Sequence, residues 1–308
     1  MNVKDYEYIA ALGKYRTISR ASQELYISQP ALSKFLQKTE QELNVCLFQR
    51  VGHQLVPTYA GQQLIQNANE ILYLHNGMLR TMADVAQQRS GQIKIGVPMS
   101  RGIFFIACVL PRFYQRYPGV CVNVHEDNTQ TLLKKLRLGE LDLVFAHIPE
   151  NSSDLHTEVV STEEMVLAAP AAYHLENSAY DDPRFRFPCL APDAWIDRPF
   201  LMLSKDQLSR KFTDQYLEER QLVPHVILKL RNLAQVLYAV GCGIGVTLCP
   251  ALPFADDMPN RLRYFSLQSE TGPASRKVAI LYRTDAYLSK AEQDLISIIR
   301  ACMNEESA

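Results

Sequence analysis

The sequence predicts an α/β protein that is preceded by a small helical unit and one long helix. Three observations favour this order. Residues 17–50 contain two helical segments around a tight turn, followed by the start of a hairpin. Residues 59–89 keep an apolar repeat of three and four residues, which is typical of one long helix. From residue 90 onward, strand-like segments alternate with helical ones, which indicates βαβ units.

The first part of the chain predicts three helices. Residues 3–14 and 17–25 each place small and apolar side chains at helical spacing. Ser28 then offers a side-chain oxygen as a helix N-cap, and Pro30 lies in the first turn, where its missing N–H costs little. We therefore expect the third helix to begin after Ser28. Its apolar stripe consists of Leu32, Phe35, Leu36, Thr39 and Leu43.

The opposite face of this third helix carries amide, hydroxyl and ammonium groups and almost no acid. Its residues are Gln29, Ser33, Lys34, Gln37 and Lys38. Glutamine can form two hydrogen bonds with adenine, and serine and lysine can bind phosphates, so this face suits DNA. The alternative is an ordinary solvated helix face, as most polar helix faces are.

Residues 21–50 follow the pattern A-S-x-x-L-x-x-S-Q-P-A-L-S-x-x-L-x-x-x-E-x-x-L-x-x-x-L-F-x-R. This pattern resembles the winged helix-turn-helix of the LysR-type transcriptional regulators, and residues 50–61 continue like that family's wing and the entry to its linker helix. The resemblance implies an all-α winged helix-turn-helix over residues 1–58 that binds double-stranded operator DNA. The residues expected to contact DNA are Gln29, Pro30, Ser33, Lys34, Gln37, Lys38, Arg50 and His53.

Five residues depart from the family's pattern. Where the family usually has Ala, Leu, Gly, Arg and Leu, this chain has Ser22, Thr39, Asn44, His53 and Pro57. Thr39 should loosen the helix core slightly. His53 removes a permanent wing charge and should weaken a phosphate contact whenever its imidazole is neutral.

Thr58 is expected to cap a linker helix over residues 59–89, which at about 1.5 Å per residue would be roughly 45 Å long. Two adjacent apolar seams run along it. One contains Leu64, Ala68, Ile71, His75, Met78, Met82 and Val85, and the other contains Ile65, Leu72, Leu79 and Ala86. Such seams favour burial against a second chain, and a dimer suits DNA because two-fold symmetric proteins bind paired half-sites. Packing on the helix's own domain is the alternative.

Residues 90–308 are expected to form the α/β part. The predicted strands are 92–97, 120–126, 141–146, 164–169, 199–203, 225–230, 246–249, 262–267 and 277–283, and the predicted helices are 102–117, 129–138, 206–220, 232–240 and 286–303. This alternation predicts parallel sheets in two lobes that are joined near 161–163 and 267–270. Lobe I would comprise 90–161 and 268–308, and lobe II 162–267. The arrangement resembles the effector domain of LysR-type regulators, whose two lobes are like those of periplasmic binding proteins.

A cleft between the lobes is the expected effector site, because ligands of α/β sheets bind beyond the carboxyl ends of strands. This rule selects Ser100, Arg101, Thr129, His147, Ser204 and Thr247. The resemblance implies a small anionic or polar metabolite as effector, no cofactor, and a homodimer that assembles into a homotetramer. Ordinary roles stay open: Ser100 and Thr129 as helix caps, Arg101 as a solvated or interlobe residue, and His147 as a satisfied wall residue.

Composition sets broad limits on function. The net charge is −1 for the whole chain, while residues 1–58 carry seven Lys/Arg and five Asp/Glu, which is the sign expected of a DNA-binding part. The seven cysteines include no C-x-x-C pair, which disfavours a zinc site and a disulfide framework. The first residues do not resemble a secretory signal and no apolar run is long enough to span a bilayer, so we expect a cytoplasmic protein.

Three other functions compete with an effector-controlled regulator. A regulator of the same family could sense oxidants through Cys242 and Cys249, although nothing nearby in the sequence would lower a thiol pKa. The two lobes alone resemble a solute-binding protein, which the DNA-binding unit disfavours. An enzyme is disfavoured because no spaced nucleophile and base occur. Glycines at 241, 243 and 245 follow a helix and precede a strand, the reverse of a dinucleotide-binding fingerprint.

Overall fold

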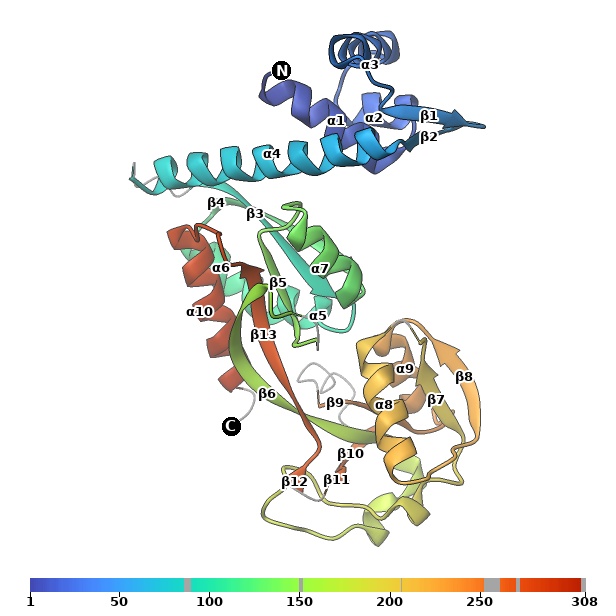
Figure 1. Cartoon of the computed structure of the whole chain (residues 1–308). Coiled ribbons are helices and arrows are strands. Elements are labelled where there is room, and N and C mark those ends of the chain that lie inside the picture. Colours follow the sequence, from blue (N-terminus) through green and yellow to red (C-terminus); the bar gives the residue numbers. More distant parts are fainter. Residues whose placement is uncertain (86–89, 150–151, 206, 252–260, 270–271, 306–308) are drawn as a thin grey trace. The chain divides into compact units, whose positions relative to one another are not determined.

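The computed structural model describes residues 1–85, 90–149, 152–205, 207–251, 261–269 and 272–305 (Figure 1). The fold divides into two compact units, Met1–Gln88 with Lys135–Leu141, and Arg89–Lys134 with Asp142–Ala308. Each unit is described by itself. The finer boundaries at residues 58 and 161 and near 267 stay predictions.

The N-terminal unit has the predicted helices and hairpin (Figure 1). Its elements are α1 (Val3–Tyr15), α2 (Ile18–Glu24), α3 (Gln29–Leu43), β1 (Phe48–Val51), β2 (Gln54–Pro57) and α4 (Tyr59–Val85). Strands β1 and β2 pair antiparallel, with Val51 opposite Gln54 across the tip of the wing. Gly52 lies at that tip with a φ of +61°, a conformation that glycine adopts without steric cost.

Side-chain caps explain where these helices begin. Ser28 Oγ accepts a hydrogen bond from Ala31 N, as the sequence predicts. Thr17 Oγ1 accepts from Arg20 N and starts α2, and Thr58 Oγ1 accepts from Gly61 N at the start of α4. The cap at Thr58 is therefore confirmed. Asn44 ends α3 in the left-handed conformation, with a φ of 50°, which asparagine tolerates better than most residues in place of glycine.

The core of the N-terminal unit joins all its helices and the wing. Its buried residues include Ile9, Leu12, Ala21, Leu32, Leu36, Leu47, Phe48, Leu55 and Ala68. Thr39 is buried as well, and its hydroxyl donates to Phe35 O over 3.0 Å, so the polar group is satisfied within the helix. A Cβ on Gly13 would lie 2.7 Å from Ile65 Cδ1, so a side chain at position 13 would require Ile65 of α4 to move.

Helix α4 has two different halves. Its first half packs Leu64, Ile65 and Ala68 on the N-terminal core, which corresponds to the alternative of packing on its own domain. Its second half exposes large apolar side chains: Ile71, Leu74, Met78, Leu79 and Met82. Leu74, which lies outside the predicted seams, is 63% exposed, whereas His75 is half-buried. The side chain of Val85, together with Ala86 and the predicted end near residue 89, lies outside the described residues.

The second unit is built on a mixed sheet with strand order β10-β6-β13-β5-β3-β4, to which β9 adds by pairing with β6 (Figure 1). The strands are β3 (Ser90–Pro98), β4 (Gly119–Asp127), β5 (Leu143–His147), β6 (Leu155–Pro170), β9 (Thr247–Pro250), β10 (Leu262–Ser266) and β13 (Ser275–Arg283). Two small sheets pair β7 (Phe200–Leu203) with β8 (Val226–Leu230), and β11 (Gln268–Ser269) with β12 (Gly272–Pro273).

Helices alternate with these strands as predicted. They are α5 (Gly102–Phe104), a π-helix (Phe105–Val109), α6 (Leu110–Arg116), α7 (Thr129–Arg137), α8 (Leu208–Glu219), α9 (Leu233–Gly241) and α10 (Lys290–Glu305), with 3-10 turns at Ala171–Tyr173, Leu175–Ser178 and Pro192–Ala194. The predicted helix over 102–117 is therefore continuous but contains one widened π turn. Helix α10 begins four residues later than predicted.

The prediction of parallel sheets is only partly right. Strands β3, β4 and β5 run parallel, as do β7 and β8. Strand β13 pairs antiparallel with both β5 and β6, and β9 and β10 pair antiparallel with β6. These strands return to the sheet after long excursions, so chain order did not reveal their direction.

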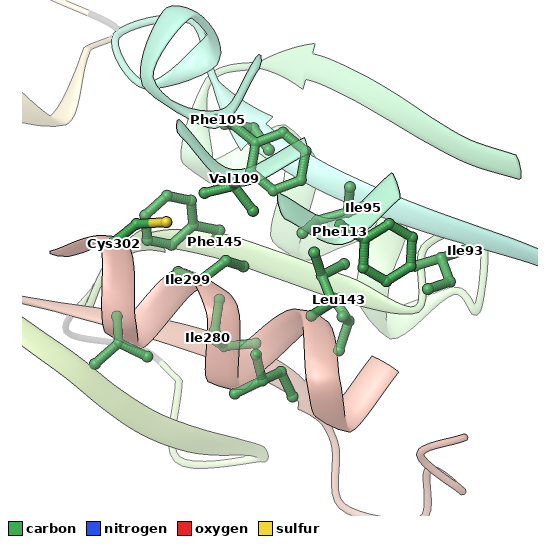
Figure 2. Close-up of a cluster of buried hydrophobic side chains, with 14 of the residues drawn as sticks. Ile93, Ile95, Phe105, Val109, Phe113, Leu143, Phe145, Ile280, Ile299 and Cys302 are labelled. Carbon is green, nitrogen blue, oxygen red and sulfur yellow. The ribbon is translucent and has the colours of Figure 1, made fainter. Parts of the chain in front are cut away.

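Strand β6 contributes to more than one buried core of the second unit. It starts at Leu155, nine residues before the predicted strand, pairs with β13 through Glu164, and pairs with β9 and β10 from Met165 onward. Separate buried cores lie along it. One contains Ile93, Ile95, Phe105, Val109, Phe113, Leu143, Phe145, Ile280, Ile299 and Cys302 (Figure 2). A second contains Met165, Leu167, Trp195, Phe200, Leu248 and Phe265. A third contains Val166, Ala168, Leu201, Leu237, Val240 and Cys249. The second predicted crossing, at 267–270, is described only to residue 269.

Candidate functional site

A groove of about 860 Å³ lies in the N-terminal unit between the start of α3 and the wing. It is lined by Thr17, Ile18, Ser19, Gln29, Pro30, Ser33, Arg50, Gly52, His53, Gln54 and Leu55. The lining contains hydroxyl, amide, guanidinium and imidazole groups and no carboxylate. A surface of this composition can bind a polyanion through hydrogen bonds and through positive charge. No carboxylate of the lining would repel the phosphates of that polyanion.

The structure brings five of the eight predicted DNA contacts into this groove: Gln29, Pro30, Ser33, Arg50 and His53. The other three, Lys34, Gln37 and Lys38, are exposed on α3 but do not line the groove. Lys38 forms an exposed ion pair with Glu42, at 3.4 Å between Nζ and Oε1. Lys34 is therefore the more available cation of this helix face.

Sequence reasoning missed three polar residues of the groove, Thr17, Ser19 and Gln54. Ser19 lies on the exposed side of α2, away from the small and apolar face that predicted this helix. In the structure, Gln29 Nε2 donates to Ser19 Oγ over 3.2 Å. A contact between residues ten positions apart depends on how α2 and α3 pack, which no local pattern encodes.

The wing is fixed to the rest of the unit by Glu40 of α3. Its Oε1 accepts hydrogen bonds from Leu47 N over 2.7 Å and from Phe48 N over 3.1 Å. On the other strand, Leu55 N donates to Arg16 O over 2.7 Å. A Cβ on Gly61 would lie 1.9 Å from Leu47 O, so only glycine permits the close approach of α4 to the start of β1. These contacts determine where Arg50 and His53 lie relative to Gln29.

The six predicted effector residues have different surroundings in the second unit. Arg101, Thr129, His147 and Thr247 are buried, while Ser100 and Ser204 are half-buried. Thr247 Oγ1 donates to Leu201 O and Ser204 Oγ to Leu230 O, so both hydroxyls already stabilise the backbone around β7. The capping alternative for the other two hydroxyls is wrong. Asn128 caps α7 by accepting from Thr131 N, and Arg101 holds the N-cap position of α5.

Arg101 and His147 meet a third residue that the sequence did not indicate, Glu163 of β6. Arg101 Nη2 lies 2.6 Å from Glu163 Oε2 and 3.0 Å from His147 Nε2, and His147 Nε2 lies 2.8 Å from the same carboxylate oxygen. The guanidinium also lies over the Phe145 ring, 5.2 Å from its centroid. All three polar side chains are buried. We call this set the buried charge cluster.

Burial controls the protonation of the cluster. Burial, followed by the Arg101 charge, lowers the pKa of His147 to about 4, so the imidazole is neutral near pH 7. Burial alone would raise the pKa of Glu163, but Arg101 and His147 lower it below its ordinary value. In a neutral imidazole, Nε2 is either a donor or an acceptor. His147 Nε2 therefore either donates to Glu163 or accepts from Arg101, and only one of these two contacts is a hydrogen bond at a time.

The cluster is not fully satisfied. Among the described residues, Arg101 Nε and Nη1 and Glu163 Oε1 have no hydrogen-bond partner, although all are buried. Buried N–H groups without a partner cost free energy, so these donors favour an additional acceptor. Glu163 also lies opposite Arg276 in the β6–β13 register. Burial lowers the pKa of Arg276 to about 10, and Arg276 stays a cation near pH 7.

The two cysteines proposed for thiol sensing differ in their surroundings. Cys249 is buried in β9, and burial raises its pKa well above the ordinary value, which disfavours the reactive thiolate. Cys242 is exposed. Within the described part of the chain, no group of three or more His, Cys, Asp or Glu residues is arranged to hold a metal. No helix of that part is long and apolar enough to cross a membrane.

Comparison with known proteins identifies both units. The family model described as "Bacterial regulatory helix-turn-helix protein, lysR family" matches residues 3–62, and "LysR substrate binding domain" matches residues 86–303. The chain is 27% identical to the HTH-type transcriptional regulator YcgK of Bacillus subtilis over 314 residues, covering 99% of this chain and 96% of YcgK. It is also 27% identical to the transcriptional dual regulator OxyR of Escherichia coli over 307 residues, with the same two shares covered.

Solved structures support the fold. Full-length OxyR from Pseudomonas aeruginosa superposes with a TM-score of 0.70 at 23% identity, covering 99% of this chain and 95% of that one. The LysR family regulator CbnR in complex with its target DNA gives a TM-score of 0.63 at 14% identity, covering 98% of this chain and all of CbnR. At these identities the likeness concerns the architecture only.

Replacing Glu40 tests the attachment of the wing. We expect Glu40→Ala to lower the free energy of unfolding of the full chain by about 1–3 kcal/mol, because two part-buried backbone N–H groups lose their acceptor. Glu42→Ala is the matched control on the same helix, and its loss should stay below about 0.5 kcal/mol because it removes only an exposed ion pair. Urea unfolding monitored by circular dichroism measures both. Equal losses for the two variants would contradict the role of Glu40.

The depressed pKa of His147 predicts a pH dependence of stability. Between about pH 6.5, the ordinary histidine value, and about pH 4, the unfolded chain binds a proton that the folded chain does not. Stability should therefore fall as the pH falls through this window, by on the order of 3 kcal/mol. In His147→Gln this part of the decline should be missing. Urea unfolding at pH 7, 5.5 and 4.5 compares the two chains, and identical pH slopes would show that His147 is not buried in its neutral form.

Proposed function

The chain belongs to the LysR family of bacterial transcriptional regulators, and we propose that it binds operator DNA as a homodimer whose affinity changes with a small effector. The observation that carries the DNA-binding part is the groove between α3 and the wing, which is lined by predicted contact residues and by no acid. The family match over both units supports the link between DNA binding and an effector.

The residue roles follow from chemistry and position. Gln29 lies at the start of α3 and can form paired hydrogen bonds with a base edge, while Ser33 and Lys34 suit phosphates or bases nearby. Arg50 and His53 extend these contacts from the wing. Pro30 contributes apolar contact, and Gln37 and Lys38 lie further along the same exposed face.

The exposed half of α4 supports dimerisation. Its apolar side chains, Ile71, Leu74, Met78, Leu79 and Met82, lie at helical spacing on a helix of 27 residues. A second copy of the helix would remove them from water, and a two-fold dimer would present two α3 helices to paired half-sites. Assembly of two dimers into a tetramer, and a place in the cytoplasm with the DNA, complete the proposal.

The buried charge cluster supports an anionic effector. Arg101 has two nitrogens without partners, and a carboxylate is the acceptor that a guanidinium binds most strongly. Without an effector, the Glu163 carboxylate pairs with Arg101, and it would compete with an effector carboxylate for the same guanidinium. Because Glu163 lies on the strand that runs through both lobes, exchange of its partner can favour one arrangement of the lobes over another. An effector can change DNA binding only if its own affinity differs between the two arrangements of the lobes.

Other functions have less support. A thiol sensor needs a thiolate, which the burial of Cys249 disfavours. The family models describe regulators, and we propose that the chain has no enzymatic activity of its own.

The salt dependence of DNA binding tests the role of Lys34. With duplexes that the full chain selects from a randomised pool, Lys34→Ala should weaken binding to all sequences alike and reduce the slope of log Kd against log salt by about 1. Lys229→Ala, an exposed lysine of the second unit, is the control and should leave the slope unchanged. Fluorescence anisotropy between low and high salt measures the slopes. Equal slopes for all three chains would remove Lys34 from the interface, and no selected duplex at all would contradict the proposed function.

A thermal-shift screen of the full chain tests the effector site. The probes are small mono- and dicarboxylic acids, each with its neutral amide as the matched control, and a bound acid raises the melting temperature by mass action. Arg101→Met should abolish a hit. Glu163→Gln should strengthen it, because the competing carboxylate is lost. Hits that prefer the amides, or that survive Arg101→Met, would contradict an anionic effector at the cluster.

A further inference from the structure

The hydrogen bond between Gln29 and Ser19 joins the first turns of α2 and α3 inside the groove. Gln29 Nε2 is the donor and Ser19 Oγ the acceptor, at 3.2 Å. Both side chains are exposed, and both line the groove that faces the wing. The contact therefore joins a predicted DNA-contacting residue to a residue of the neighbouring helix, at the surface where DNA would bind.

Ser19 is not needed to build its own helix. Thr17 Oγ1 provides the N-cap of α2 by accepting from Arg20 N. The buried hydroxyl of Ser22 donates to Ser19 O over 2.9 Å, so the structural hydrogen bond of this turn uses the Ser19 backbone and not its side chain. The Ser19 hydroxyl is thus available for Gln29.

This hydrogen bond determines which groups Gln29 presents to a ligand. A glutamine amide has two N–H donors and one carbonyl oxygen. Ser19 accepts from one N–H and thereby restricts the rotation of the amide, so Oε1 and the second N–H are not used by Ser19 and are left for a ligand. A neighbouring donor and acceptor match the N7 acceptor and the N6 donor of adenine in the major groove. Guanine presents two acceptors at the same edge and does not match.

We propose that Ser19 is a positioning residue that sets the base preference of Gln29 for adenine. The inference rests on the proposed function, because it needs Gln29 at the DNA. With Ser19 in place, the amide is oriented before DNA arrives, so binding does not have to order it. Because Ser19 Oγ is the acceptor in this hydrogen bond, its own O–H can donate to a DNA phosphate oxygen.

The experiment compares base preferences of five full-length chains: wild type, Gln29→Ala, Ser19→Ala, Ser19→Thr and Gln23→Ala. Each selects duplexes from one randomised pool, and sequencing gives the preference at every position. The position at which Gln29→Ala loses its preference marks the Gln29 contact. Gln23 is exposed on the same helix as Ser19 but does not line the groove, so it is the matched control.

We expect wild type to favour adenine at the marked position by roughly 5- to 150-fold, the range of a good paired contact. Ser19→Ala should reduce this preference about 2- to 10-fold at that position alone, since the amide must now be ordered on binding. Ser19→Thr keeps a hydroxyl and should retain the preference, and Gln23→Ala should match wild type. Melting curves of all five chains, which should coincide, separate positioning from loss of fold.

Three outcomes would overturn the inference. Ser19→Ala could retain the full adenine preference, or it could lose preference equally at all positions, or the marked base could be one other than adenine. Failure of the proposed function has a different signature: wild type would select no sequence, or Gln29→Ala would leave every position unchanged.

Discussion

The carboxylate of Glu40 is the contact on which the N-terminal unit most depends. It accepts the two backbone N–H groups with which the wing begins, at Leu47 and Phe48, and so ties β1 to the helix that carries Gln29. The groove exists because these contacts hold the wing at a fixed distance from the start of α3. Gly61 supports the same arrangement from α4, since any side chain there would collide with Leu47 O. Charged and amide groups can then converge on one polyanion without reorganisation, which favours both affinity and sequence preference.

In the second unit the corresponding constraint is the buried charge cluster on β6. Arg101 comes from the turn after β3, His147 from the end of β5, and Glu163 from β6, whose later half belongs to two other cores. A buried ion pair with unfilled hydrogen bonds gives little net stability, but it responds strongly to a new charged partner. This property suits a site whose task is to change state. On the proposed function, the same chain combines a preorganised surface for DNA with an incompletely satisfied site for a small ligand.

The sequence predicted those features that depend on neighbours along the chain. Ser28 and Thr58 mark helix starts because their oxygens accept N–H groups three residues onward. The wing, which pairs β1 with β2, was predicted from the resemblance of residues 50–61 to the family's pattern. Features that depend on packing escaped prediction. Residues 156–164 are polar except for Val159 and Val160, which concealed the first half of β6 and with it Glu163. The contact between Ser19 and Gln29, the cap at Asn128 and the antiparallel direction of β13 likewise arise only after distant segments meet.

Hydroxyl-radical footprinting of the full chain on a duplex that it selects from a randomised pool tests whether the chain recognises an operator as a two-fold dimer. We expect two protected segments with inverted sequence, separated by about one helical turn or a multiple of it, as a two-fold dimer with α3 in the major groove requires. A single protected segment would contradict the dimer that the exposed half of α4 supports. Uniform protection along the duplex, without any preferred sequence, would contradict base reading by α3 and the proposal that this chain recognises an operator.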